Sequence, residues 1–131
     1  RSSDLNAAGL TRQSKLVYQV SKDLCSAQQM VSRLIQQQLS FSAIIGSEDI
    51  IAIGAQKALS AAGISIPVIG CNNSMLAECA TPALTSIDNR LDILCPAAVD
   101  VLTKILDNGP QAAPSQTVFP AIIQYRESFT E

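Results

Sequence analysis

The chain has 131 residues, with nine basic and eleven acidic side chains and a net charge of −2. Hydrophobic residues make up 47% of it, enough for a chain of this length to bury a core, which excludes a disordered protein. No run of Lys or Arg could neutralise phosphates, so direct DNA binding by this chain is not expected. The low charged fraction of 15% predicts that an interface covers part of the surface.

Metal and cofactor chemistry is not expected from the composition. Histidine is absent and the cysteines show no CxxC spacing, so we expect no metal site, no cofactor and no nucleophile activated by a base. The cysteines are predicted to be buried thiols in the reducing cytoplasm: Cys25, Cys71, Cys79 and Cys95.

Targeting signals are not apparent either. No apolar run reaches the roughly 18 to 20 residues of a membrane span, so no membrane partner is expected, and the start "RSSDLNAAGL" lacks the apolar core of a signal peptide. The first residue is Arg1, and we expect the chain to be a fragment of a longer protein.

The first elements differ in how clear their patterns are. Residues 1–13 have a weak helical pattern, and the β-forming residues of 15–20 predict a short strand. An amphipathic helix follows, with Ser26 placed to cap its start, because apolar residues recur at helical spacing: Ala27, Met30, Val31, Leu34 and Ile35.

Strands and helices then alternate. The run "FSAII" at 41–45 predicts a buried strand, and residues 48–62 predict a helix that stops before Gly63, a typical left-handed cap. A strand at 64–70 leads into a short helix at 74–80.

The last third of the chain continues this alternation. We expect a strand over 83–87, a long apolar helix that begins near Cys95 or bends there because of Pro96, and a closing strand over 117–126. Short strands that are apolar on both faces, alternating with helices, predict an α/β fold with a parallel sheet flanked by helices.

Two polar loops follow predicted strands, "GSED" at 46–49 and "GCNNS" at 70–74. In open parallel sheets, ligands bind beyond the carboxyl ends of the strands. In the first loop, Ser47, Glu48 and Asp49 are explained by helix capping alone, but Glu48 at the mouth of a cleft could also accept hydrogen bonds from two vicinal hydroxyl groups.

The second loop contains Asn72 and Asn73, whose amides suit polyol recognition. Turn formation explains the same residues, because Asn favours left-handed conformations. Arg90 and Arg126 are interpreted as solvated or paired surface residues. The chain contains no GxGxxG or Walker motif, and an enzyme would need catalytic groups that the sequence does not show.

The order of segments from residue 41 to 89, "FSAIIGSEDIIAIGAQKALSAAGISIPVIGCNNSMLAECATPALTSIDN", resembles the C-terminal part of regulators of the lactose/galactose repressor family. In that family the corresponding motifs are an Asn-Asp pair, A-x-G, G-x-x-x-P, V-x-G-F-D-D and P-x-L-T-T. The closing "IIQYRES" is similar to the family's L-x-x-R-x-S. The counterparts here are Glu48–Asp49, Ala52–Gly54, Gly63–Pro67, Gly70–Asn73 and Pro82–Ser86.

This resemblance implies an incomplete two-lobed core of the type I periplasmic-binding-protein-like fold. Residues 1–83 would form the C-terminal lobe without its first strand, residues 84–116 would supply a crossover strand and helix to the N-terminal lobe, and residues 117–131 would return to the C-terminal lobe. Operator DNA would be bound only through a helix-turn-helix that this chain lacks.

By position, the family's effector-contacting residues become Arg1, Glu48 and Asn72, with Ser47, Asp49 and Asn73 behind them. The implied function is sensing of a sugar-like effector and homodimerisation in a cytoplasmic repressor. The alternative is the solute-binding protein of a sugar transporter. Because Glu48, Cys71 and Asn72 replace the family's Asn, aromatic residue and Asp, we expect an effector other than plain galactose or lactose.

Overall fold

The computed structural model describes residues 7–9, 14–114 and 116–129. The helical pattern predicted for residues 1–13 lies largely outside this part of the chain. The elements, in chain order, are η1 (Ser14–Leu16), α2 (Leu24–Gln36), β1 (Ile44–Ile45), α3 (Asp49–Ala61), β2 (Val68–Cys71), α4 (Met75–Cys79), β3 (Thr85–Asp88), α5 (Leu91–Asn108), η2 (Pro110–Ala112) and β4 (Ile122–Gln124).

The sheet has the strand order β1-β2-β3-β4. The first three strands are parallel, and the closing strand β4 pairs antiparallel with β3. Helix α3 packs against β1 and β2, and α2 packs against α3. The predicted α/β class and the mostly parallel sheet are therefore confirmed.

Helix α2 forms where its apolar spacing predicts it, with Ala27, Val31 and Leu34 buried. Its N-cap is Asp23 and not the predicted Ser26. The carboxylate of Asp23 accepts hydrogen bonds from the backbone N–H of Ser26 at 2.8 Å and from its hydroxyl at 2.7 Å, and these bonds lower the pKa of Asp23. Ser26 is the third residue of the helix, so its N–H is one of the free donors that a cap residue satisfies.

Helix α3 carries the main core. Its buried Ala52, Ala55 and Leu59 pack with residues of α2 and the sheet. Gly54 allows α2 to approach, because a Cβ at this position would collide with the backbone of α2 and lie 2.8 Å from the Cβ of Ala27. The helix ends as predicted before Gly63, whose φ is +67°.

The strand predicted at 15–20 is wrong. Residues 14–16 form the short helix η1, and residues 17–20 pair with no strand in the described part of the chain. β-Forming residues alone do not make a strand, because a strand also needs a neighbour to accept and donate its backbone hydrogen bonds.

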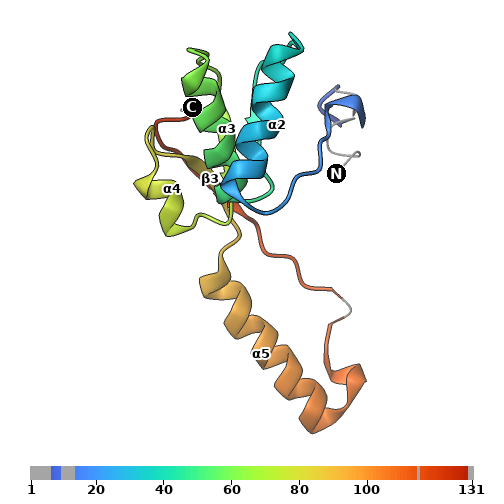
Figure 1. Cartoon of the computed structure of the whole chain (residues 1–131). Coiled ribbons are helices and arrows are strands. Elements are labelled where there is room, and N and C mark those ends of the chain that lie inside the picture. The colour runs from blue at the N-terminus through green and yellow to red at the C-terminus, as the bar shows by residue number, and fades with distance from the viewer. Residues whose placement is uncertain (1–6, 10–13, 115, 130–131) are drawn as a thin grey trace.

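Helix α5 begins at Leu91, four residues before the predicted start near Cys95, and continues through Pro96. It projects away from the sheet and its helices (Figure 1), and none of its residues is buried. The carbonyl that Pro96 leaves without a donor can therefore reach solvent. The exposed large apolar side chains of α5 are Leu91, Ile93, Leu94, Val99, Leu102 and Leu106.

Two leucines provide a matched test of where the core lies. Leu84, which is fully buried against α3 and β2, should lose about 2 to 5 kcal/mol of unfolding free energy on Leu84→Ala, because a cavity remains. Leu102→Ala on α5 should change it by less than about 0.5 kcal/mol, since that side chain is 56% exposed. Urea denaturation of this chain measures both, and an equal loss would contradict this description of the core.

Candidate functional site

The carboxyl ends of β1, β2 and β3 lie at one edge of the sheet, because these strands are parallel and adjacent. We call this the ligand edge; it is formed by residues 46–49, 71–74 and 88–90. Both loops predicted from the sequence therefore meet there, and a third loop after β3 joins them. Helix α5 leaves the sheet from the same edge (Figure 1).

Asp49 connects the first loop to the second loop and to strand β3. Its side chain is buried, although it belongs to the first turn of α3. One carboxylate oxygen accepts hydrogen bonds from the backbone N–H and the hydroxyl of Ser74, at 2.6 and 2.7 Å. The other accepts from the hydroxyl of Ser86 at 2.5 Å. Asp49 is therefore a structural anchor of the ligand edge, and its side chain is not available to a ligand.

Gly70 is required by this arrangement. A Cβ at residue 70 would collide with the carboxylate of Asp49 and lie 2.7 Å from the side chain of Leu84. Only glycine lets β2 run this close to the anchor, which explains why a glycine precedes the polar loop.

The loop after β2 has an unusual backbone. Asn72 and Asn73 have φ values of +95° and +47°, in the left-handed region that Asn tolerates better than most residues. The exposed side chain of Asn72 accepts a hydrogen bond from the amide of Asn89 at 3.0 Å. The amide of Asn73 donates to Asp88 at 3.1 Å. Two amides, Asn72 and Asn89, thus stand together at the open edge.

Glu48 is the N-cap residue of α3, but its side chain does not cap the helix. It forms an ion pair of 2.6 Å with the exposed Lys22, and this interaction raises the pKa of Lys22. Ser47 is exposed, and the helix begins without its side chain as the cap. The ligand edge therefore presents a carboxylate, an ammonium group and two amides.

Arg1 lies outside the described residues. Three cavities in the described part of the chain are lined by neither Glu48 nor Asn72. The parallel strands bring the residues of the ligand edge to one side of the sheet, with Ser47 and Asn72 exposed there.

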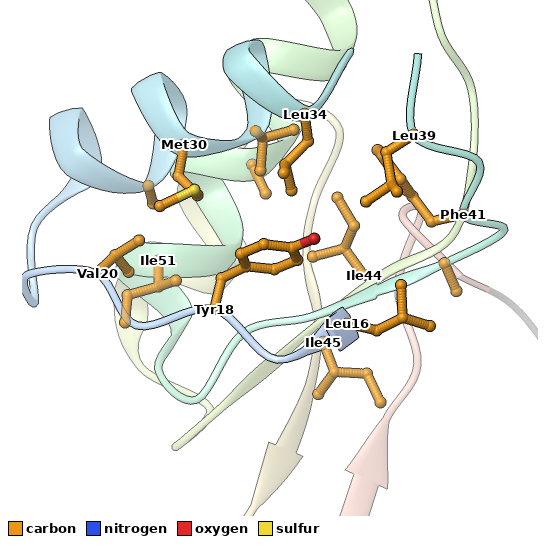
Figure 2. A pocket seen from close by; sticks show the side chains of 14 residues that line it. Leu16, Tyr18, Val20, Met30, Leu34, Leu39, Phe41, Ile44, Ile45 and Ile51 are labelled. Carbon is orange, nitrogen blue, oxygen red and sulfur yellow. The ribbon is translucent and has the colours of Figure 1, made fainter. Parts of the chain in front are cut away.

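One of these cavities has a mostly apolar lining. It has a volume of about 200 Å³ and is bounded by residues 16–20, α2 and β1 (Figure 2). Leu16, Tyr18 and Val20, at alternate positions, line it together with Ile44 and Ile45 of β1. The residues mistaken for a strand thus face the outer edge of β1 across an apolar space.

The prediction that the four cysteines are buried is wrong for three of them. Cys25, Cys79 and Cys95 are exposed and not buried as predicted, because they lie on outward faces of helices. All four cysteines are free thiols. No group of three potential metal ligands occurs in the described part of the chain, and no described helix is long and apolar enough to cross a membrane.

Sequence reasoning missed Lys22, Asp88, Asn89 and Arg126. Asp88 and Asn89 could have been found, because they follow the predicted strand 83–87 as the other two loops follow theirs. Lys22 and Arg126 reach the site through tertiary contacts with no local signal. Of the two alternatives predicted for Arg126, solvated or paired, the second is confirmed, because its side chain is only 16% exposed and lies 3.2 Å from the carboxylate of Glu78.

The fold and the ligand edge define a periplasmic-binding-protein-like α/β domain. The family of periplasmic binding protein-like domains matches residues 4–129, and the chain belongs to this family. Among curated relatives, a helix-turn-helix transcriptional regulator of Lachnoclostridium phytofermentans is 33% identical over 109 residues, covering 80% of this chain and 33% of that protein. The regulator AscG of Escherichia coli is 30% identical over 110 residues, 81% of this chain and 33% of AscG.

Solved structures agree. The crystal structure of the Escherichia coli repressor AscG superposes with a TM-score of 0.80 and 26% identity, over 99% of this chain and 48% of that one. The regulator CelR in complex with cellobiose gives 0.81 at 23% identity, over 97% of this chain and 40% of that one. The resemblance to the lactose/galactose repressor family is confirmed. The chain spans about a third of the length of these curated relatives.

Asp49 has a matched control in Asp100. Asp49→Asn should lower the unfolding free energy by about 2 to 3 kcal/mol, because an amide group cannot accept all three hydrogen bonds at a buried site. Asp100→Asn removes only an exposed ion pair with Lys104 and should cost less than about 0.5 kcal/mol. Urea denaturation distinguishes them, and similar losses would show that Asp49 is not the anchor.

Proposed function

We propose that this chain is the effector-sensing segment of a cytoplasmic transcriptional repressor that responds to a sugar or sugar derivative. Glu48, Asn72 and Arg1 contact the effector; Arg1 is outside the residues that the structure describes. Ser47, Asp49 and Asn73 support these contacts from behind. The full protein binds operator DNA through a separate helix-turn-helix and acts as a homodimer.

The observation that carries this proposal is the meeting of Glu48, Asn72 and Asn89 at one open edge of a parallel sheet. A carboxylate accepts hydrogen bonds from two neighbouring hydroxyl groups, and a primary amide both donates and accepts. Sugars offer adjacent hydroxyl groups in fixed geometry, so this combination suits them. Ser47, which is exposed beside Glu48, adds a further hydroxyl.

The relatives support a regulator over a transporter component. The curated relatives are helix-turn-helix transcriptional regulators, and CelR was solved with cellobiose. A LacI-family regulator from Arthrobacter was solved with lactose. The replacement of the family's Asn and Asp by Glu48 and Asn72 favours an effector with a different hydroxyl pattern or an added charged group, and not plain galactose or lactose.

We assign residues 1–83 and 117–131 to one lobe, and residues 84–116 to the crossing into a second lobe. The crossover strand of this segment, β3, still pairs with β2, so the chain leaves the first sheet only after Asp88. The apolar face of α5, without buried residues here, suits packing in a second lobe. The segment after β4 supports the return, because Ser128 donates a hydrogen bond to Val68 of β2 at 2.6 Å.

The same assignment places an additional strand in the apolar cavity beside β1. The outer edge of β1 faces this cavity, and residues 16–20 line its other side in alternation (Figure 2). A strand there would pair with both and fill the space with apolar side chains. The relatives are about three times as long as the match, which leaves ample chain to supply it.

The response to the effector follows from this arrangement. Because the ligand edge is open on one side, a sugar bound there is enclosed only when a second lobe closes over it. The effector then favours the closed state by its differential affinity for the two states, and the dimer passes this change to the DNA-binding domains.

Binding of sugars to the full-length protein tests the proposal. We expect one or more members of a panel of cellobiose, other disaccharides and sugar phosphates to bind in calorimetry, with affinity reduced about tenfold or more by Glu48→Ala and by Asn72→Ala. Asn108→Ala, at the far end of α5, is the control and should change the affinity less than about twofold.

Binding that is unchanged in both Glu48→Ala and Asn72→Ala would move the effector site away from the ligand edge. Tight binding of plain galactose or lactose would contradict the predicted preference, and a panel with no binder at all would count against a sugar effector.

A further inference from the structure

Arg126 lies two residues after β4, in the turn that closes the chain onto β3. Its backbone N–H donates to the hydroxyl of Thr85 at 2.7 Å, and that hydroxyl donates onward to the carbonyl of Phe129 at 2.6 Å. The rings of Tyr125 and Phe129, whose centroids are 6.1 Å apart, bracket the turn. The backbone around Arg126 is therefore fixed on the buried strand β3.

From this fixed position the guanidinium group reaches the loop after β2, residues 71–74, which we call the ligand loop. One nitrogen donates to the carbonyl of Leu84 at 2.9 Å, and the other donates to the side-chain carbonyl of Asn73 at 2.7 Å. The second nitrogen also lies 3.2 Å from the carboxylate of Glu78, which is 68% exposed. The two short hydrogen bonds go to neutral oxygens, so the position of Arg126 is not explained by an exposed ion pair.

Asn73 needs such support. A non-glycine residue with positive φ is strained, and Asn72 and Asn73 have this conformation in succession. The side-chain nitrogen of Asn73 donates to Asp88, and its side-chain oxygen accepts from Arg126. The backbone N–H of Asn73 donates to the hydroxyl of Ser86. Arg126 contributes the one bond that comes from the closing segment of the chain.

We propose that Arg126 is the positioning residue of the ligand loop. It holds the side chain of Asn73, which keeps the backbone of Asn72 and Asn73 in the strained conformation that presents Asn72 at the edge. Arg126 does not touch the effector. The inference rests on the proposed function only in treating Asn72 as an effector contact.

This arrangement joins the ligand loop to the strand that returns from the crossing. Residues 116–121 lead into β4, and Arg126 lies two residues after its end. Any displacement of Asn72 and Asn73 on effector binding therefore acts on Arg126 and on the end of β4. A contact between residues 53 positions apart in the sequence thus links the ligand edge to the closing segment of the chain.

Amide hydrogen exchange of the full-length protein without added ligand, resolved by residue, tests this proposal. In Arg126→Gln we expect exchange at residues 72–74 to accelerate about tenfold or more, while the amides of α3 change less than about twofold. Glu78→Gln is the matched control, because it removes only the exposed partner of Arg126, and it should leave residues 72–74 unchanged.

Arg126→Lys is the second variant. It keeps the positive charge for Glu78, but one ammonium group cannot hold Leu84 and Asn73 in the same fork geometry. It should accelerate exchange at residues 72–74 in the same way. Because it keeps the charge, it serves as the test variant if Arg126→Gln does not fold.

Three results would overturn the proposal. These are unchanged exchange at residues 72–74 in Arg126→Lys, an equal acceleration throughout β2 and α3, or the same local acceleration in Glu78→Gln. Because no sugar is present, these outcomes are independent of whether any sugar binds, and a failure of the proposed function is seen separately in the calorimetry.

Discussion

The buried carboxylate of Asp49 determines the geometry of the ligand edge. It stands at the start of α3 and accepts hydrogen bonds from the loop after β2 and from β3. Burying a carboxylate costs free energy unless its oxygens accept hydrogen bonds. The groups that donate these bonds are therefore held in position beside Asp49. Three segments that are distant in sequence are thereby set in one arrangement. The partly exposed Glu48 and the exposed Asn72, which are next to Asp49 and Asn73 in the chain, are positioned by it.

The division between Glu48 and Asp49 follows from this anchor. The two acids are adjacent, yet one is buried and satisfied by protein donors while the other faces outward and pairs with Lys22. Only the outward carboxylate can exchange its partner for a ligand. In the same way, Asn73 is occupied by protein contacts, while Asn72 is exposed. Each polar pair thus contains one residue fixed by several protein contacts and one residue on the more open side of the ligand edge, which we propose for effector recognition.

The sequence predicts the helices and the edge well because their signals are local. The spacing of apolar residues defines α2, and the polar loops after two strands identify the ligand edge. Signals that depend on distant partners fail. The strand at 15–20 lacks a neighbour with which to pair. The cap of α2 is a local error of another kind, because Asp23, three residues before Ser26, provides it. The role of Arg126 follows only from its contact with Asn73, which no local pattern encodes.

A double-mutant cycle between Asp49 and Ser86 tests most directly whether this carboxylate organises the edge. The unfolding free energies of Asp49→Ala, Ser86→Ala and the double variant give the coupling between a residue of α3 and a residue of β3. A coupling of about 1.5 to 3 kcal/mol is predicted for a buried hydrogen bond to a charged group. Additive effects within about 0.5 kcal/mol would contradict it, because the loops would then hold their arrangement without Asp49.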